Sequence, residues 1–574
     1  MLKLFRFLKP YTIPIIFTLI LIFIQTMSDL YLPTLMAEIV NNGITKGDTD
    51  FIIKTGGFML LITFGGMICA VIASFFASQA SVGLGRILRN KTFSKVESFS
   101  LNEFDKMGTA TLITRTTNDI IQVQMVTVMI IRMMVAAPMM CIGGIIMALS
   151  KDKQLSLVLL VALPILALFI GIAAKFGLPL FRSIQVKIDN MNLVLREYLT
   201  GIRVIRAFNR TEHENERFKK TNEDLTNNYI KVNRLMAFLM PTVMLIMNLT
   251  TIAILWFGGM RIENGMDVGS LIAFTQYAMQ IMFSVLMVTM MFIMVPRAQA
   301  AAIRINEVLE INPDIVDPIN PKSTNDIKGV VEFKDVSFSY HGAEQPAISN
   351  INFVAKSGEV TAIIGGTGSG KSTLVNLITR FYDVDNGSVL VDGVDVRNLT
   401  QKELRNKIGF VPQKSVLFSG TIKENIKFGN QDATDYEVIK ALEIAQATDF
   451  IQEKEEGLEH MISEGGTNVS GGQKQRLSIA RAIIRKPEIL VLDDSFSALD
   501  FKTDAKLRKA LKKEATNSTV FIISQRVSTV MDADRIIVLD NGKIEGIGIH
   551  KELLENCPVY KEIVSSQLSA EELL

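Results

Sequence analysis

The sequence is poor in cysteine and histidine, and it carries almost no net charge. Three cysteines occur in 574 residues, and two of them (Cys69 and Cys141) lie inside apolar runs, which excludes a disulfide framework. With 60 Lys and Arg against 58 Asp and Glu, the net charge of +2 argues against a surface built mainly to bind a polyanion. A cleavable signal is not expected either, because the first long apolar run starts near Thr12, has no small-residue cleavage site and is followed by similar runs.

What the chain has in abundance is apolar residues, which make up 48% of it, while charged residues make up only 21%. Six apolar runs are long enough to cross a hydrocarbon core of about 30 Å, which needs roughly 20 helical residues. The runs cover approximately 13–35, 54–80, 125–149, 155–181, 236–260 and 268–296. Buried helices of a large soluble protein are the alternative, but such helices rarely run this long with so few charges. We therefore predict an α-helical, six-span transmembrane domain over residues 1–310.

Lys and Arg are distributed unequally among the loops that join these runs. The loops after the second and fourth runs are long and basic, whereas the loops on the opposite side are short and contain few basic residues. By the positive-inside rule, the long loops and both termini are cytoplasmic. The long loops are polar and patterned like helices, so the helices should continue beyond the bilayer, and residues 1–9 are expected to form a short interfacial helix. Asp29 and Arg132 lie within spans, where each faces a cavity, a partner or an interface, or simply snorkels.

The composition changes near Pro321. All but two of the 28 methionines precede residue 331, and the long apolar runs end in the same region. Residues 311–328 are rich in Pro, Asn and Asp and are predicted to form a linker. From 329 to 574, short β-type runs alternate with helical patterns, which is typical of a soluble α/β domain.

A glycine-rich loop in this second part has the spacing of a phosphate-binding P-loop, or Walker A motif. It follows an apolar strand at 360–364 and precedes a helical run that starts at Leu374, as such a loop requires. Backbone N–H groups and the helix N-terminus can surround the phosphates, Lys371 can reach the β- and γ-phosphates, and Ser372 can ligate Mg²⁺. The loop consists of Gly365, Gly366, Thr367, Gly368, Ser369, Gly370, Lys371, Ser372 and Thr373.

A second motif is the apolar strand at 488–492, which ends in Asp493 and Asp494. A carboxylate at the end of a buried strand beside a phosphate loop holds Mg²⁺ or its water, so Asp493 is assigned that role. Such a strand alone would mean little, because many apolar runs end in Asp.

A third motif lies between the first two along the chain. Residues Val469–Arg476 (VSGGQKQR) closely resemble the signature sequence of ABC ATPases, and they lie just before the acidic strand, as in that family. Other matches follow the family's order: Tyr340 as the adenine-stacking aromatic, Gln413 in VPQ, the segment Leu417–Ile426 typical of exporters, and the D-loop ending at Asp500. With six spans ahead of the ATPase, the chain resembles an ABC exporter half-transporter. Without the resemblance, Tyr340 would be read as an ordinary edge-strand aromatic and Gln413 as a surface glutamine.

The resemblance implies how these residues act. Gln413 would belong with Ser372 and Asp493 to the Mg²⁺ site, and also to the catalytic residues. In the family, the signature loop faces the γ-phosphate bound to the opposite subunit, so two chains sandwich two ATP molecules. Here that loop is formed by Ser470, Gly471, Gly472 and Gln473.

Two positions depart from the family, and both concern hydrolysis. At the position where the family usually has the catalytic Glu, this chain has Asp494. Its side chain is one methylene shorter, so its carboxylate would lie about 1.5 Å further back if the backbone is unchanged. At the position where the family usually has the switch His, this chain has Gln525. Its amide can donate a hydrogen bond, but it does not titrate. Together they resemble the degenerate-site subunit, the LmrC- or EfrC-like half, of heterodimeric bacterial multidrug ABC exporters. The resemblance implies a partner half-transporter with intact Glu and His.

Two cytoplasmic segments match the family's coupling helices, Thr114–Asp119 and Gly201–Phe208. Their charged side chains could pair across a polar interface with an ATPase domain; the alternative is that they are solvated turns of long helices. The candidate coupling residues are Arg115, Asp119, Arg203 and Arg206.

The sequence therefore predicts an ATP- and Mg²⁺-dependent exporter subunit that moves hydrophobic or amphipathic compounds across a plasma membrane, one of bacterial type by resemblance. A homodimeric flippase for lipids or lipid-linked compounds is the alternative within the class, and intact hydrolytic residues would favour it. An ATP-binding sensor or regulatory membrane subunit is the alternative from another class, and the intact signature and D-loop weigh against it. Partners expected are membrane lipid, amphipathic small molecules and a second half-transporter, with no nucleic acid.

Overall fold

The computed structural model describes residues 1–263, 265–324, 328–514 and 518–567, and these form two compact units. The first unit contains Met1–Glu97 and Ala110–Ile311, and the second contains Asn312–Leu574 together with Ser98–Thr109. The segment Ser98–Thr109 was expected within the transmembrane domain. It belongs with the second unit because its short helix α4 (Leu101–Met107) hydrogen-bonds there: Asn102 Nδ2 donates to Asp314 Oδ2 at 2.6 Å.

The first unit confirms the six predicted spans. Within the described residues, six helical segments are long and apolar enough to cross a membrane. The helix α3, with 49 residues, is about 70 Å long at 1.5 Å per residue, more than twice the hydrocarbon core, as expected of helices that continue beyond the bilayer. The main helices are α2 (Thr12–Glu38), continued by η2 (Ile39–Ile44), α3 (Thr49–Glu97), α6 (Asn118–Lys151), α7 (Ser156–Thr200), α9 (Thr211–Glu263) and α10 (Val268–Glu310).

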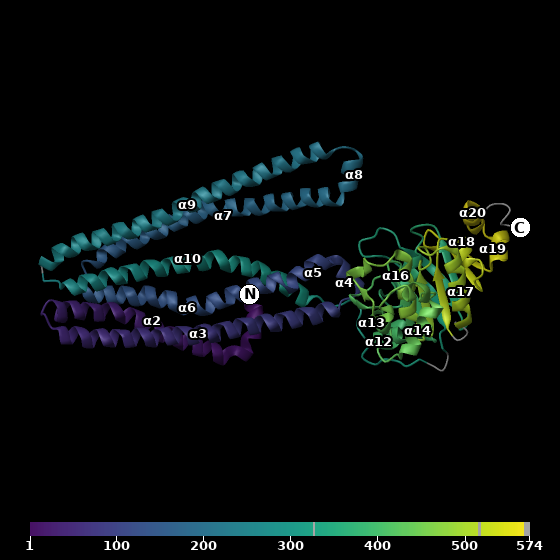
Figure 1. Cartoon of the computed structure of the whole chain (residues 1–574), viewed down its shortest axis with the longest axis horizontal. Helices are drawn as coiled ribbons and strands as arrows, with labels where there is room; N and C mark the ends of the chain where they lie inside the picture. Colours follow the sequence, from purple (N-terminus) through teal and green to yellow (C-terminus); the bar gives the residue numbers. More distant parts are fainter. Residues whose placement is uncertain (264, 325–327, 515–517, 568–574) are drawn as a thin grey trace. The chain divides into compact units, whose positions relative to one another are not determined.

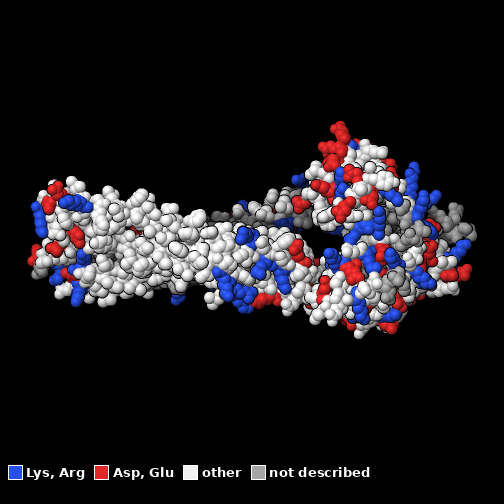
Figure 2. Space-filling view, turned by 90° about the horizontal axis from the view of Figure 1, so that it is seen from below, with Lys and Arg blue, Asp and Glu red and all other residues white. Residues whose placement is uncertain are grey.

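Four of these helices, α2, α3, α6 and α10, run side by side, while α7 and α9 form a hairpin closed by the short helix α8 (Ile202–Ala207) (Figure 1). Phe274 and Tyr277 of α10 are fully buried against Leu30 of α2 and Ala148 of α6. On the face shown in Figure 2, the middle of this unit is a belt with very few charged side chains, and charged side chains gather beyond its ends. An apolar belt of this kind is the surface that a membrane protein presents to lipid.

The N-terminal segment is helical, as expected, and its place at a lipid interface stays a prediction. It consists of α1 (Leu2–Phe5) and η1 (Arg6–Tyr11), and Leu4 is fully buried among side chains of α3, α6 and α10. The Lys3 ammonium also pairs with Glu310 at 2.6 Å. The apolar side of this helix therefore packs on protein.

The second unit is an α/β domain, as predicted. Its larger described sheet has the strand order β12-β11-β3-β10-β9-β6 and is parallel except for β12, and its second sheet is antiparallel with the order β2-β1-β4-β5. The first sheet comprises β3 (Val360–Gly365), β6 (Ile408–Val411), β9 (Ile489–Asp493), β10 (Thr519–Ile523), β11 (Arg535–Asp540) and β12 (Lys543–Gly548). The second comprises β1 (Val331–Phe338), β2 (Ile348–Ala355), β4 (Asn386–Val391) and β5 (Val394–Asp395), and a short pair joins β7 (Gly420–Thr421) to β8 (Met461–Ile462).

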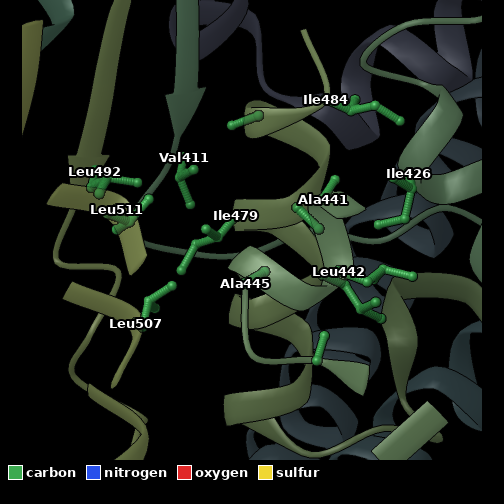
Figure 3. Packing of buried hydrophobic residues seen from close by; sticks show 14 of the residues in the cluster. Val411, Ile426, Ala441, Leu442, Ala445, Ile479, Ile484, Leu492, Leu507 and Leu511 are labelled. Carbon is green, nitrogen blue, oxygen red and sulfur yellow. The ribbon is translucent and has the colours of Figure 1, made fainter. Parts of the chain in front are cut away.

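Helices cover the larger sheet, and this accounts for its near-continuous apolar strands: every residue of β9 and β10 is buried. In Figure 3, Ile479 lies between Val411 and Leu507 on one side and Ala441 and Ala445 on the other. The described helices are α11 (Lys371–Ile378), α12 (Gln401–Lys407), α13 (Ile422–Lys427), α14 (Asp435–Ile444), α15 (Thr448–Gln452), α16 (Gly471–Ile483), α17 (Phe501–Glu514), α18 (Val527–Val530), α19 (His550–Asn556) and α20 (Pro558–Gln567).

The predicted linker, 311–328, contains no helix or strand in its described part, and residues 325–327 lie outside the described residues. It is anchored to the second unit by backbone hydrogen bonds: the Lys322 N–H donates to the Asn398 carbonyl at 2.9 Å, and Arg380 donates to the Val316 carbonyl at 3.3 Å. The linker therefore packs along the α/β domain.

Candidate nucleotide site

The phosphate loop lies between β3 and α11, where the sequence predicted it. Its glycines are required by space: a Cβ on Gly365 would lie 2.1 Å from the Leu539 carbonyl oxygen, and one on Gly370 would lie 2.6 Å from Ile348 Cγ2. Gly370 and Gly368 also adopt φ values of +97° and +82°, which L side chains rarely adopt. The loop therefore brings its backbone N–H groups to the N-terminus of α11, which is a site for anions.

The Lys371 side chain is folded into this loop. Its ammonium donates to the carbonyl oxygens of Gly365 at 2.9 Å and Gly366 at 2.5 Å. Burial lowers the pKa of Lys371, while the nearby carboxylates of Asp493 and Asp494 act in the opposite direction. The ammonium is thus held by weak neutral acceptors in a partly dry site, where phosphate oxygens would be stronger partners.

Asp493 ends β9 directly opposite the phosphate loop. The Ser372 hydroxyl donates to Asp493 Oδ1 at 3.1 Å, and burial raises the pKa of Asp493. No cluster of three metal-ligating side chains occurs in the described part of the chain. A hydroxyl and a carboxylate at this distance fit Mg²⁺ that arrives with nucleotide, because Mg²⁺ keeps several waters and takes phosphate oxygens as ligands. When bound, the cation would neutralise phosphate charge.

Asp494 follows in a left-handed backbone conformation, with φ of +45°, which is uncommon for a residue other than glycine. Its N–H donates to the Ile523 carbonyl at 3.0 Å, and its carboxylate accepts from Gln413 Nε2 at 3.5 Å. Gln525 lines the same cavity, which has a volume of about 310 Å³. The structure therefore gathers around one cavity most of the predicted nucleotide-site residues: Tyr340, Thr367 to Thr373, Gln413, Asp493, Asp494 and Gln525.

Tyr340 lies at the rim of this cavity. Its hydroxyl is 3.0 Å from Thr373 Oγ1, and its ring packs edge-on against Phe338 and Tyr382, both with ring centroids within 5.4 Å. Sequence reasoning did not identify Tyr382. Its hydroxyl donates to Asp105 Oδ2 of α4 at 3.5 Å, and burial, followed by the Asp105 charge, raises the pKa of Tyr382 to about 12. An aromatic pair thus connects the rim of the cavity with α4.

The signature residues Ser470 to Gln473 and the D-loop Asp500 do not line this cavity. Ser470 is exposed and forms a capping box at the start of α16: Gln473 N–H donates to Ser470 Oγ at 3.3 Å, and Ser470 N–H donates to Gln473 Oε1 at 2.9 Å. Asp500 caps α17 by accepting from the Thr503 N–H at 3.0 Å. Ser470 and Asp500 are both exposed at the surface of this unit.

Gln475 was also missed by sequence reasoning, although it lies within the signature helix. It is buried, accepts from the Ala498 N–H at 3.2 Å and lies 3.5 Å from the Asp494 carbonyl oxygen. The sequence offered one signal for Gln475: it is a polar residue on the inner face of an amphipathic helix. It connects the signature helix with the acidic pair.

Two predicted coupling residues have partners inside the membrane unit. Asp119, 4% exposed, accepts two hydrogen bonds from Arg304 of α10 at 2.8 and 2.5 Å, and Arg115 pairs with Glu307 of the same helix at 2.8 Å. Arg203 and Arg206 are exposed on α8. The structure therefore places the first pair where it fastens α10, while a contact with an ATPase domain stays a prediction for all four.

Comparison with known proteins agrees with both units. Residues 15–285 match the family model described as ABC transporter transmembrane region, and residues 348–497 match the model described as ABC transporter. The chain is 40% identical over 570 residues to the ABC transporter ATP-binding protein YfiB of Bacillus subtilis, covering 99% of each chain. It is 44% identical over 565 residues to the ABC transporter ATP-binding protein Rv1273c of Mycobacterium tuberculosis, covering 98% of this chain and 97% of the other.

A more distant relative is the ATP-dependent lipid A-core flippase of Vibrio vulnificus, which is 31% identical over 567 residues and matches over 98% of this chain and 96% of its own. Among solved structures, a bacterial Atm1-family ABC exporter with ATP bound has a TM-score of 0.81, with 23% identity, 97% of this chain and 98% of that chain covered. That structure shares the fold. Since both domain models and full-length relatives match, the chain belongs to the ABC transporter family, as an exporter half-transporter with a six-span transmembrane domain and an ATP-hydrolysing domain.

Proposed function

We propose that this chain is one subunit of a heterodimeric ATP-driven exporter for hydrophobic or amphipathic compounds. Its own site binds ATP with Mg²⁺ but hydrolyses it poorly, and its signature loop completes the active site of a partner that carries Glu and His. The observation that carries the proposal is that Asp494 and Gln525, the residues we assign to the hydrolytic positions, line one cavity with Lys371, Ser372 and Asp493.

The geometry of Asp494 supports slow hydrolysis. Its backbone is fixed by the hydrogen bond to Ile523, so the shorter side chain cannot be moved forward by a simple backbone shift. A carboxylate misplaced by about 1 Å costs roughly 100-fold in rate. Gln525 is held at its backbone, where its carbonyl accepts from Gln567 Nε2 at 2.7 Å, and its amide lacks the proton-transfer capacity of an imidazole.

The groups that would bind ATP and Mg²⁺, by contrast, are all present. The phosphate loop keeps its glycines and Lys371, and Ser372 and Asp493 lie at hydrogen-bond distance from each other. The exposed helix start at Ser470 is intact as well. A chain that preserved its signature loop but lost its own base would remain useful only beside a second ATPase domain.

A groove on the ATPase unit supports coupling through α8 of a partner chain. It has a volume of about 320 Å³ and is lined by aromatic and Arg side chains, among them Phe381, Phe418 and Arg481. On α8 and just after it, Val204 and Phe208 are 60% and 75% exposed. Apolar side chains flanked by Arg203 and Arg206 would suit a groove of this composition.

A lipid flippase is the second candidate, favoured by the relatives named lipid A-core flippase. A homodimeric flippase would carry two copies of the Asp494 and Gln525 site, so both its sites would be slow. An ATP-binding sensor would have no need of Ser470 and Asp500 in their capping positions. The Lys and Arg residues of the long loops support a cytoplasmic position for these loops and for the termini, in a plasma membrane that is bacterial by resemblance.

The test uses the chain co-purified with the ABC half-transporter encoded beside it, reconstituted in lipid vesicles. Ser470→Ala in this chain should abolish ATPase activity and dye transport by the pair. Thr434→Ala is the matched control, because Thr434 forms the same capping box at α14, away from the nucleotide. Full ATPase activity of the chain purified alone, or of the pair carrying Ser470→Ala, would contradict the proposal.

A further inference from the structure

A short segment, residues 524–526, joins the sheet strand β10 to the helix α18, and it contains no helix or strand of its own. Its first residue is fixed to the sheet, because Ser524 is 2% exposed and its N–H donates to the Ile363 carbonyl at 3.2 Å. Its middle residue, Gln525, is exposed and lines the nucleotide cavity. We call residues 524–526 the switch segment.

One side chain from another helix holds this segment by two hydrogen bonds. Gln567, the last residue of α20, donates from Nε2 to the Gln525 carbonyl at 2.7 Å. Its Oε1 accepts from the Val527 N–H at 2.9 Å. A carbonyl and an N–H together require a donor and an acceptor on one group, which an amide supplies and a carboxylate does not. The two bonds therefore fix the orientation of the Gln567 amide.

The bond to Val527 also satisfies the start of α18. This helix begins at Val527, and its N-cap residue, Arg526, forms no side-chain cap. The first N–H groups of a helix have no partner within the helix, so an acceptor from another element is needed to satisfy them. Gln567 supplies one, and the switch segment consequently ends at a helix start that depends on this side chain.

The helix α20 is a firm support for Gln567. Its Tyr560 and Val564 are fully buried in one cluster with Val527 and Val530 of α18. The two helices accordingly lie next to each other in Figure 1. Water could replace either hydrogen bond of Gln567, but it would not hold the two backbone groups in a fixed position relative to the packed helix.

The switch segment is fastened on its other side as well. Arg526 donates from Nη2 to the Ser497 carbonyl at 2.8 Å, just before the D-loop residue Asp500. The backbone of Gln525 is thus held between this loop and α20, while its side chain lines the nucleotide cavity.

From these contacts we infer that Gln567 is a positioning residue of the nucleotide site: its amide fixes the backbone of Gln525 so that the Gln525 side chain meets the γ-phosphate of ATP. The inference rests on the proposed function for the place of the γ-phosphate, and it makes α20 a part of the site. Because ADP lacks this phosphate, Gln567 contributes to the binding of ATP and not to the binding of ADP.

The test compares a nucleotide that has a γ-phosphate with one that does not. The full-length chain is purified in detergent, and calorimetric titration gives its Kd for the non-hydrolysable ATP analogue AMP-PNP and for ADP, both with Mg²⁺. Gln567→Leu should raise the Kd for AMP-PNP about tenfold, as expected for a lost hydrogen bond to a charged group, and leave the Kd for ADP unchanged. A general loss of structure would weaken both nucleotides alike.

Ser566→Leu is the matched control. Ser566 is the exposed neighbour of Gln567 on α20, and its hydroxyl donates to the Ile563 carbonyl of the same helix at 2.8 Å. This variant should bind both nucleotides like the parent chain. The same selective loss in Ser566→Leu would show that any change at the end of α20 suffices, and would overturn the inference.

A double-mutant cycle tests whether Gln567 acts through Gln525. Gln525→Ala alone should also raise the Kd for AMP-PNP about tenfold, and the double variant with Gln567→Leu should lose no more affinity than either single variant. Losses that add in the double variant would show that the two residues act separately, and would overturn the positioning role.

Gln567→Glu is the second variant, because it preserves the length of the side chain and the acceptor for Val527. Its carboxylate cannot donate to the Gln525 carbonyl, so the preference for AMP-PNP should fall here too. Unchanged AMP-PNP binding, or equal losses for AMP-PNP and ADP, in both Gln567 variants would overturn the inference and leave the exporter standing. Full ATPase activity of the parent chain alone, with a selective loss in Gln567→Leu, would keep the positioning role and overturn the proposed function.

Discussion

At the scale of single residues, the proposed slow hydrolysis depends on two side chains, Asp494 and Gln525. Asp494→Glu together with Gln525→His should raise the ATPase rate of the chain purified alone by about 10- to 100-fold, because the longer carboxylate recovers the reach to the attacking water. Phosphate release in detergent solution measures it. The same double variant with Lys371→Ala is the control and should be inactive; a double variant no faster than the parent chain would show that the rate is limited elsewhere.

Burial of the Asp493 carboxylate lowers the folding stability of the ATPase domain. Burial raises its pKa from 3.8, so the folded chain binds this proton more tightly than the unfolded chain. The resulting penalty is absent below pH 3.8, grows as the pH rises through the folded pKa, and is complete above it. Asp493→Asn should therefore raise the nucleotide-free melting temperature at pH 8, by about 2–4 °C for each kcal/mol recovered. The same variant should no longer be stabilised by ATP with Mg²⁺; a lower melting temperature would contradict this account.

At the scale of elements, α6 and α10 are fastened by a nearly buried ion pair. Asp119 is 4% exposed and its partner Arg304 is 44% exposed. Removing one partner of a buried pair costs about 3 kcal/mol, the lower end of the range because Arg304 reaches solvent. Asp119→Ala should thus lower the melting temperature of the purified protein by several degrees. The control is Lys3→Ala, whose pair with Glu310 is exposed on both sides and is worth about 0–1 kcal/mol. Equal losses in the two variants would count against the packing role of Asp119.

The helix α4 hydrogen-bonds to Tyr382, whose ring packs on Tyr340 at the rim of the nucleotide cavity. Tyr382→Phe removes the hydrogen bond to Asp105 but keeps the ring against Tyr340, so stimulation of ATPase activity by transported dye should fall while the KM for ATP changes little. Its raised pKa, about 12, keeps the phenol neutral up to pH 10, and this bonded form is lost only as the pH rises through 12. The stimulation should therefore not titrate at Tyr382 between pH 6 and 9. Tyr436→Phe, at an exposed position of α14, is the control; loss of stimulation in both variants would remove Tyr382 from this role.

The sequence predicts those elements and residues that are marked by a pattern within one short segment. The six spans follow from long apolar runs, and the phosphate loop and the acidic strand follow from short motifs in their required order. It did not reach contacts between distant segments. Tyr382 and Asp105 are 277 residues apart, and the burial of Leu4 depends on side chains from three other helices. Such contacts are set by tertiary packing, which periodicity within one segment does not encode.

At the scale of the whole molecule, the chain holds one complete nucleotide-binding surface and one signature surface that faces no nucleotide of its own. Under the proposed function, two chains would close each site, and Asp494 and Gln525 would make the two sites of a heterodimer unequal. ATP would then remain bound on one side while it turns over on the other.

The measurement that tests this central claim most directly identifies the nucleotide left on each chain. The reconstituted pair is incubated with radiolabelled 8-azido-ATP, Mg²⁺ and orthovanadate, photolysed, and separated into its two chains. The account predicts labelled ATP on this chain, lost in Lys371→Ala, and trapped ADP on the partner, lost in Ser470→Ala of this chain. Trapped ADP on this chain at the same level as on the partner would show that Asp494 and Gln525 hydrolyse normally, and would contradict it.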